Sequence, residues 1–426
     1  MQKIAIVTKS ALADWQSCRS ITANLIESYR RILGVEIRVF EIEESNTIYD
    51  LYSVASDLSK WAPGHVIFVD YKPCPALVLK ALNEAFADRV LPRIIIHVFG
   101  DFVLESPVWI SHEEVLKRFK ITWVCASSRQ AKLVSQFLQN ENSTVNHLPF
   151  PVNMEQFHYS EGRRELERSN LSLEASEFVI FYSGRLSLQK NVIQLVQIFT
   201  SLAKVFPQPL VLLLAGPIDD LGNPYFGRHH PEGLMSYRLQ TLFSEANRSS
   251  TSEVRYLGDL NSQELAPVYN AADLFVSLST HNDEDYGMSP AEALMSGCFC
   301  LLSDWGGYSD FNQILPQQTA LAPINFNSDS RIDLNNATKA LFGAILLAQQ
   351  SNMKLNSDRA AQVLSCSNIS QRLEKIIGQK ELRNFQGWNS LFREVKYTLA
   401  IKGAAPFAVG QNPSELYKRV YSVYAN

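Results

Sequence analysis

Residues 178–191 read FVIFYSGRLSLQKN, a short apolar run that ends in a glycine-containing loop. The run Phe178–Tyr182 predicts a buried β-strand. Gly184 permits a tight turn off this strand, and Asn191 is a suitable N-cap for a helix that begins at about Val192. A buried strand, a short loop and a helix form the repeating unit of a parallel sheet covered by helices, so this stretch predicts an α/β fold.

The same alternation extends along the chain in both directions. Beyond residue 192 we expect helices at Gln263–Ala271 and 290–296, among the strands Leu210–Ala215, Val254–Leu257, Leu274–Leu278 and Cys298–Leu302. In the first third we expect the helices Ile21–Leu33, Ala76–Phe86 and Gln130–Leu138, among the strands Ile4–Val7, Val35–Phe40, His65–Asp70, Arg93–His97 and Thr122–Cys125. The sequence therefore predicts two doubly wound, Rossmann-like domains that face one another across a cleft, with ligands at the carboxyl ends of the strands.

Length and composition agree with two globular domains. A chain of 426 residues is too long for one ordinary core. Two prolines at 148–153 break the alternation, and we interpret the polar residues 160–176 that follow as a domain linker. The net charge of −4 gives no basic field for nucleic acid. The first residues read as a strand rather than a signal peptide, six cysteines form no CxxC pair, and no apolar run is long enough for a membrane span. These features predict a cytoplasmic protein.

Two cations lie on the loop after the strand 178–182. Arg185 and Lys190 should occupy the ligand-binding edge of the sheet, where a guanidinium fork and an ammonium point charge suit a diphosphate. The alternative is that both are ordinary solvated loop cations.

A second chemical signal is the stretch EDYGMSPAE at residues 284–292. Its two carboxylates, Glu284 and Glu292, flank a loop that runs into a short helix whose first N–H groups can receive an anion. Such a site suits a sugar hydroxyl, a ribose and a phosphate together. The alternative is a capping box with Ser289 at the N-cap, in which Glu292 only satisfies the N-cap amide and Gly297 ends the helix. The cations on another loop of the same sheet favour the ligand site.

Two further glycines follow strands of the same domain. Gly216 ends the strand 210–215 and Gly258 ends the strand 254–257. Both permit the close backbone approach that a nucleobase site needs, although a turn alone would explain either one.

In these motifs the chain resembles the retaining GT-B glycosyltransferases of family 4 (glycosyl transferases group 1). Residues 183–191 resemble that family's G-R-x-x-x-x-K-[NG] phosphate loop, and Glu284 to Glu292 its E-x7-E motif. The intervening and following motifs occur in the family's order: Leu214-Ala215-Gly216, Tyr256-Leu257-Gly258, Ala271-Ala272-Asp273-Leu274, Glu292–Gly297 and Gly306-Gly307. The resemblance covers roughly residues 178–311.

The resemblance implies a role for each matching residue. Arg185 and Lys190 would neutralise the donor diphosphate as it leaves, Glu284 would hold hydroxyls of the transferred sugar, and Glu292 would hold the ribose. The remaining residues of the implied nucleotide-sugar site are Gly184, Gly216, Leu257, Gly258, Gly287, Met288 and Ser289. His97 ends a strand of the first domain, where the family often has a histidine that contacts the donor sugar. Family members need no metal or other cofactor, and retention comes from front-side attack.

The resemblance thus implies a hexosyltransferase that moves a hexose from a nucleotide-sugar to a saccharide or lipid-linked acceptor in polysaccharide or glycan synthesis. UDP-glucose is the expected donor by family frequency, and the inner face of the membrane is a further option for its location. The final helix, Pro413–Tyr424, would cross back onto the first domain. The expected domains are therefore an acceptor-side domain of residues 1–154 plus about 405–426, and a donor-side domain of residues 155–404.

One departure and several rival interpretations remain at this stage. The first loop, Thr8–Ala13, lacks the glycines that are common in the family, so the acceptor side is unusual. Asp283-Glu284-Asp285 is a D-x-D string that could bind Mn²⁺ in a GT-A transferase. A sugar-nucleotide epimerase would need acid–base residues in the cleft, and only His97 is clearly placed for that role. Asp101, after Gly100, is a weaker candidate on the acceptor side. A non-catalytic nucleotide-binding protein would share the whole set of charged residues.

Overall fold

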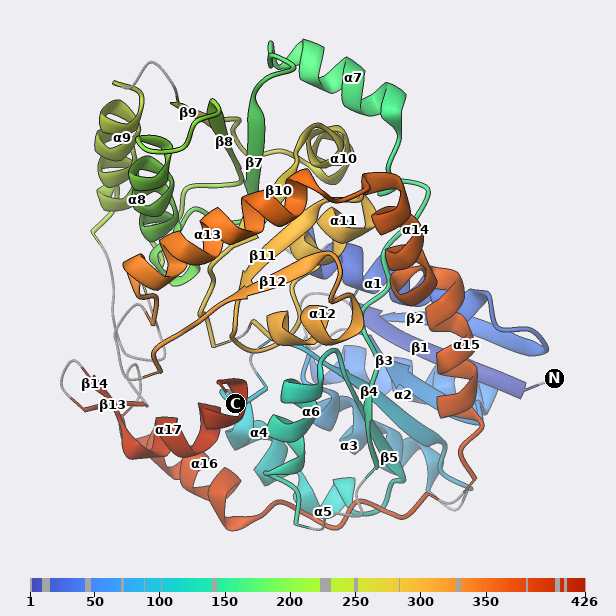
Figure 1. The fold of residues 1–426 in the computed structure, drawn as a ribbon. Helices are drawn as coiled ribbons and strands as arrows, with labels where there is room; N and C mark the ends of the chain where they lie inside the picture. Colours follow the sequence, from blue (N-terminus) through green and yellow to red (C-terminus); the bar gives the residue numbers. More distant parts are fainter. Residues whose placement is uncertain are drawn as a thin grey trace. The chain divides into compact units, whose positions relative to one another are not determined.

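The computed structural model describes residues 2–9, 16–42, 47–69, 73–87, 89–100, 102–139, 144–222, 231–248, 252–282, 284–326, 331–380, 382–402, 407–409 and 412–425. The chain forms two compact units (Figure 1). Unit 1 contains Met1–Pro151 and Cys366–Pro406, and unit 2 contains Val152–Ser365 and Phe407–Asn426.

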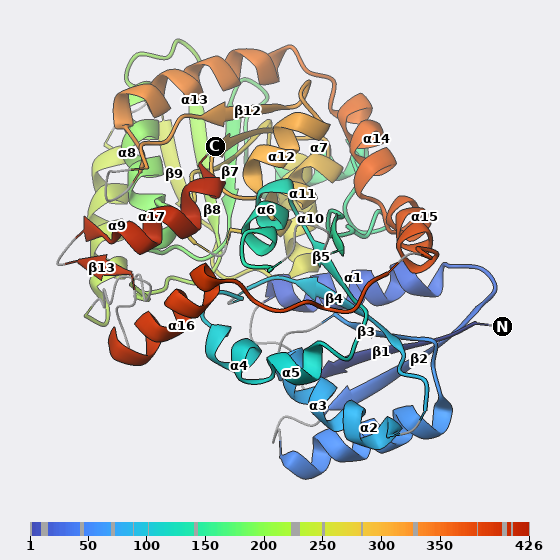
Figure 2. The ribbon, with the colours of Figure 1, turned by 90° about the horizontal axis from the view of Figure 1, so that it is seen from below.

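Unit 1 is built on a parallel six-stranded sheet of order β2-β1-β3-β4-β5-β6. Its strands are β1 (Gln2–Lys9), β2 (Val35–Ile42), β3 (His65–Phe68), β4 (Arg93–Val98), β5 (Ile121–Cys125) and β6 (Thr144–His147). Its helices are α1 (Gln16–Arg30), α2 (Ile48–Trp61), α3 (Pro75–Phe86), α4 (Ser106–Ser111), α5 (Glu113–Leu116), α6 (Ser128–Ser135), α15 (Cys366–Ile377) and α16 (Ser390–Lys402). Figure 2 shows α1 and α15 on one face of the sheet, and α2 and α3 on the other.

Unit 2 has a second parallel six-stranded sheet, of order β12-β11-β10-β7-β8-β9. Its strands are β7 (Phe178–Ser183), β8 (Leu210–Ala215), β9 (Ser252–Tyr256), β10 (Leu274–Ser277), β11 (Phe299–Ser303) and β12 (Thr319–Ala322). Its longer helices are α7 (Glu161–Asn170), α8 (Val192–Ala203), α9 (Leu234–Ala246), α10 (Ser262–Ala271), α11 (Met288–Met295), α12 (Tyr308–Ile314), α13 (Leu334–Gln349) and α14 (Met353–Leu364). The strand order reverses between β7 and β10, and doubly wound sheets bind ligands at such a switch point.

The core of unit 2 explains why its strands read as continuous apolar runs. Every residue of β7 and β8 is buried, because helices cover both faces of the sheet. Leu212 and Leu214 of β8 pack in one cluster with side chains of α8 and α13, among them Phe199 and Leu341. Each such side chain contributes roughly 1.5–3 kcal/mol on burial, so the strands that carry the site loops are held firmly.

The predicted α/β fold of two doubly wound sheets is confirmed, and each expected strand overlaps an observed one. The linker expected at 160–176 is different in the structure, because it contains the helix α7. Ser160 accepts a bond from the Arg163 amide as the N-cap, and Arg164 pairs with Asp273 at 2.5 Å. These contacts stabilise a helix that has no buried face of its own.

The two units also differ from the expected domains in the last sixty residues. Residues 366–404, which we expected in the second domain, lie in unit 1, where Trp388 packs against Trp109 and Trp123. The final segment, which we expected on the first domain, lies in unit 2, where Tyr424 packs against Trp305. Burial of these aromatic side chains therefore determines which of the two units each segment belongs to.

Among the described residues, no helix combines the length and the apolar character that a membrane crossing requires.

Candidate active site

The site is built from two loops that leave the sheet of unit 2 at its switch point. We call residues 184–191, which follow β7, the β7 loop, and residues 278–287, which follow β10, the β10 loop. Asn191 joins them, because its Nδ2 donates to the Leu278 carbonyl at 2.7 Å and to Thr280 Oγ1 at 3.0 Å. Asn191 is the N-cap residue of α8, as predicted, but its side chain makes no cap bond to that helix and its φ is 53°.

The two loops bring together the first pair of predicted site residues. Lys190 Nζ lies 2.5 Å from Glu284 Oε2, and both side chains are largely buried, with 18% and 8% of their surfaces exposed. Tyr182 and Tyr308 surround the same carboxylate. Burial raises the pKa of both phenols, and the charge of Glu284 raises it further. A buried carboxylate with one ammonium partner is a strongly coupled pair, since removal of either side leaves an unpaired charge.

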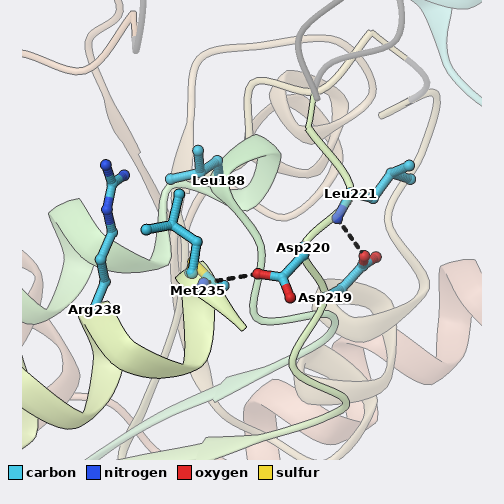
Figure 3. A pocket seen from close by; sticks show the side chains of 7 residues that line it. Leu188, Asp219, Asp220, Leu221, Met235 and Arg238 are labelled. Atoms are coloured by element: carbon cyan, nitrogen blue, oxygen red, sulfur yellow. Dashed lines mark hydrogen bonds between the residues drawn. The ribbon is translucent and has the colours of Figure 1, made fainter. Parts of the chain in front are cut away.

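Arg185, the other predicted cation, has a different partner. Its Nη1 lies 2.8 Å from Asp219 Oδ2, and its Nη2 lies 3.4 Å from Gln189 Oε1. Asp219 follows β8, and its other oxygen accepts a bond from the Leu221 amide at 2.6 Å. Figure 3 shows Asp219 beside Asp220, which caps the start of α9 through the Met235 amide. Asp219 was not predicted from the sequence, because no local pattern marks it as a partner of Arg185.

A shallow pocket lies next to this ion pair (Figure 3). Its lining combines apolar side chains with two carboxylates and one guanidinium: Leu188, Asp219, Asp220, Leu221, Leu234, Met235 and Arg238.

Glu292 lies inside α11 and is 5% exposed. The N-cap of that helix is Gly287, without a side-chain cap bond, so the capping box centred on Ser289 is wrong. The Tyr269 hydroxyl donates to Glu292 Oε2 at 3.2 Å, and Ser183 Oγ lies 2.6 Å from the same hydroxyl. Burial raises the pKa of Glu292 to about 8, and the Tyr269 bond lowers it only in part. Gly297 has the positive φ of 91° expected for the residue that ends the helix.

The glycines of the site serve close backbone packing. A Cβ on Gly216 would lie 2.1 Å from the Gly184 carbonyl oxygen, so the loop after β8 packs on the loop after β7 where Gly216 leaves no room for a side chain. A Cβ on Gly287 would lie 2.4 Å from the Tyr308 ring. Gly258 has open space beside it and a φ of 89°, which indicates a turn requirement. Leu257, next to it, extends the pairing of β9 with β8, because its amide N–H donates a hydrogen bond to the Leu214 carbonyl.

The β10 loop is further fixed by the glycine pair after β11. A Cβ on Gly306 would meet the Glu284 carbonyl oxygen at 2.3 Å, and one on Gly307 would meet that of Asp285 at 2.1 Å. The Gly307 amide donates to the Glu284 carbonyl at 2.8 Å. These small residues let another backbone pass directly behind the loop that carries Glu284.

His281 is a second residue near the site that was not predicted from the sequence. It lies on the β10 loop, three positions before Glu284, and is 8% exposed. Burial lowers the pKa of its imidazole well below the usual value, and the nearby charges of Lys190, Arg185 and Arg331 lower it further. The ring is therefore neutral, and it adds no charge to a site that already holds two cations.

His97 lies in unit 1, within β4, and is 1% exposed. Its Nε2 lies 2.8 Å from the Tyr29 hydroxyl, and burial lowers its pKa to about 3. A neutral, buried imidazole of this kind fits the structural interpretation of His97 as well as the functional one.

Some candidates fall outside the described residues: Asp101, Asp283 and residues 10–13 of the first loop. Glu284 and Asp285 of the D-x-D string have the partners Lys190 and Tyr424 respectively. In the part of the chain that the structure describes, no three His, Cys, Asp or Glu side chains gather as a metal site.

Residues 163–317 match the family model described as Glycosyl transferases group 1. No curated protein matches the sequence significantly.

Solved structures share the fold over nearly the whole chain. Sucrose-phosphate synthase from Thermosynechococcus elongatus is 17% identical, with 89% of this chain and 99% of that chain covered and a TM-score of 0.60. HepE from Anabaena, in complex with UDP-glucose, is 14% identical, with coverages of 89% and 100% and a TM-score of 0.59. A glycosyltransferase from Rickettsia africae is 13% identical, with coverages of 88% and 97% and a TM-score of 0.63. The matched domain, on a fold shared with GT-B glycosyltransferases, indicates a glycosyltransferase.

Proposed function

We propose that this glycosyltransferase is a retaining, metal-independent hexosyltransferase that takes its hexose from a nucleotide-sugar, with UDP-glucose as the first donor to test. The acceptor in this proposal is a saccharide or a lipid-linked saccharide of glycan synthesis, reached from the cytoplasm or the inner face of the membrane. The observation that carries the proposal is the Lys190–Glu284 pair at the switch point of the sheet. HepE, which shares the fold, has been crystallised with UDP-glucose.

A bound donor would separate both ion pairs, Lys190 from Glu284 and Arg185 from Asp219. Lys190 and Arg185 would turn towards the diphosphate oxygens, which exchanges their contacts with Glu284 and Asp219 for a doubly charged ligand. Glu284 would then accept bonds from hydroxyls of the hexose. Glu292 would accept from the ribose, and the N–H groups of the first turn of α11, at Met288 and Ser289, would add to the phosphate site.

In the proposed reaction the bond between the anomeric carbon and the β-phosphate oxygen breaks, and the acceptor oxygen bonds to the same face of that carbon. The acceptor proton passes to the departing phosphate oxygen. Lys190 and Arg185 stabilise the negative charge that develops on the diphosphate, which is the role that fixed cations serve in phosphoryl leaving-group chemistry. This chemistry requires no metal ion in the proposal.

The test is to incubate the protein with UDP-, GDP- and ADP-hexoses in the presence of EDTA and to measure nucleotide release. A transferase should hydrolyse one of these donors slowly, an epimerase should interconvert the sugars, and a binding protein should do neither. We expect Lys190→Ala and Glu284→Ala each to lower the rate at least about 100-fold, whereas Lys204→Ala, an exposed cation after α8, should not. Near-normal rates in both site variants would contradict the proposal.

A further inference from the structure

The last residues of the chain pack against the β10 loop. The C-terminal segment, residues 407–425, comprises β13 (Ala408–Val409), β14 (Asn412–Pro413), α17 (Glu415–Tyr421) and the 3₁₀ turn η3 (Ser422–Tyr424). Phe407, Tyr417, Tyr421 and Tyr424 are all fully buried in the structure. The rings of Tyr417 and Tyr421 stack at 4.8 Å, and Tyr424 meets Trp305 edge-on at 5.6 Å. These contacts fix the segment on unit 2.

Two phenol groups of this segment reach the residues on either side of Glu284. The Tyr424 hydroxyl donates to Asp285 Oδ1 at 2.6 Å, in a fully buried bond. The Tyr417 hydroxyl donates to Asn282 Oδ1 and also accepts from Arg331. The carbonyl of Tyr424 in turn accepts from the Gly306 amide at 2.9 Å, next to the glycine that supports Glu284.

The rest of the β10 loop is held by donors that lie outside it. Ser303 donates to the carbonyl of Ser279 at 2.5 Å, and Trp305 to that of His281 at 2.6 Å. Arg331 donates to the carbonyl of Thr280 at 2.9 Å.

Arg331 also depends on the C-terminal segment. Its guanidinium lies over the rings of Trp305 at 4.2 Å and of Tyr417 at 5.1 Å. Each described residue from 279 to 285 thus receives a bond from another part of unit 2, and the C-terminal segment supplies or supports three of these bonds.

This arrangement matters for Glu284 because its ion-pair partner Lys190 is the group that a diphosphate would take away. Once that ion pair is exchanged, the carboxylate keeps its hydrogen bond with the Tyr308 side chain, and the backbone on either side of it fixes the position of the loop. We propose that Tyr424 and Tyr417 are positioning residues, which hold the β10 loop so that Glu284 meets the hexose hydroxyls of the donor. The inference rests on the proposed function, since it assigns a support to the sugar-binding carboxylate of that site.

The test compares Tyr424→Phe with wild type. Titration calorimetry gives the Kd for the nucleotide-sugar that the wild type hydrolyses and the Kd for the corresponding nucleoside diphosphate, and initial rates give kcat. Phenylalanine keeps the buried ring and removes only the oxygen that donates to Asp285. We expect the Kd for the nucleotide-sugar to rise about 5- to 20-fold and kcat to fall by a similar factor, whereas the Kd for the diphosphate alone should change less than twofold. Each tenfold step corresponds to about 1.4 kcal/mol.

The matched control is Thr319→Val on β12, which also removes one buried hydroxyl, from a bond to Leu315 at 2.9 Å. It should lower the melting temperature without changing either Kd. Tyr417→Phe provides a second test in case Tyr424→Phe does not fold. It should also raise the Kd for the nucleotide-sugar more than the Kd for the nucleoside diphosphate.

The possible outcomes distinguish the inference from the proposed function. An equal loss of affinity for the nucleotide-sugar and for the diphosphate would indicate a general structural role and would overturn the inference. Unchanged affinity and unchanged kcat in both tyrosine variants of an active enzyme would also overturn it. If the wild type neither binds nor hydrolyses any nucleotide-sugar, the proposed function itself fails, and the inference fails with it.

Discussion

Replacing Glu292 with glutamine tests the electrostatics of the site most directly. The carboxyl group lies in α11, nearly without solvent exposure, and its nearest hydrogen-bond donor is the neutral Tyr269 hydroxyl. Burial therefore favours the protonated form and raises its pKa from 4.5 to about 8. Glutamine keeps the size and an oxygen acceptor for Tyr269, but it never becomes charged.

The sign of the effect follows from proton linkage. Between pH 4.5 and about 8 the folded protein holds a proton on Glu292 that the unfolded chain has released, so the free energy of unfolding of wild type falls as the pH rises. The slope is about 1.4 kcal/mol for each pH unit, and the whole rise in pKa corresponds to about 5 kcal/mol. We therefore expect Glu292→Gln to be progressively more stable than wild type from pH 5 to pH 8, with no further gain above about pH 8.

The assay is urea unfolding of both proteins in the same buffers at pH 5, 6, 7 and 8, with the difference in unfolding free energy plotted against pH. Taking the difference removes the contributions of all other titrating groups. Glu245→Gln, an exposed position on α9, is the control, because its carboxyl group stays in water in both states. A difference for Glu292→Gln that stays flat from pH 5 to pH 8 would refute the reasoning, since Glu292 would then be ionised in the folded protein.

Three further predictions concern neighbouring features. Asp219→Asn should tighten the binding of UDP several-fold in calorimetry without metal, because Arg185 would lose its competing carboxylate while the Leu221 amide keeps an acceptor; weaker binding would count against this. Gly216→Ala should lower the unfolding free energy by about 2–4 kcal/mol in urea titrations, because the φ of Gly216 is 130° and the new Cβ would clash with Gly184. The control is Gly343→Ala, in α13 with open space around it, which should be neutral or stabilising by up to about 1 kcal/mol. His97→Asn should remove a pH dependence of the unfolding free energy, because burial lowers the pKa of the folded imidazole to about 3. As the pH falls from 6.5 towards 3, wild type should lose up to about 1.4 kcal/mol of unfolding free energy per pH unit relative to the variant. The same difference between the two proteins in urea unfolding at pH 4 and at pH 7 would contradict this.

The elements that the sequence predicted well are the ones with strong local patterns. The strand Leu210–Ala215 was predicted residue for residue, because six buried apolar positions between turn residues have few other interpretations. The strand β6 and the helix α2 were missed. All four residues of β6 are only half-buried, and α2 begins with the exposed Ile48 and Tyr49, so neither shows a clean apolar pattern.

The site divides in the same way. The sequence alone marked Arg185, Lys190, Glu284 and Glu292 as candidates, since each stands at a fixed spacing on a loop or helix start that follows a predicted strand. It could not tell which charges meet. Lys190 and Glu284 are ninety-four positions apart, and Arg185 and Asp219 thirty-four, and both pairs exist only because the strand order brings their loops to one edge.

The sequence by itself determined the type of fold and the chemical groups that the protein presents, because apolar period and turn residues act over a few neighbouring positions. Only the tertiary structure decided the protonation and the support of those groups. Burial of Glu292 beneath Tyr269, and the contact of Tyr424 with Asp285, depend on residues distant in the chain that the packed core brings together. The pKa of a carboxyl group and the position of a loop are properties of that surrounding, which no local stretch of sequence contains.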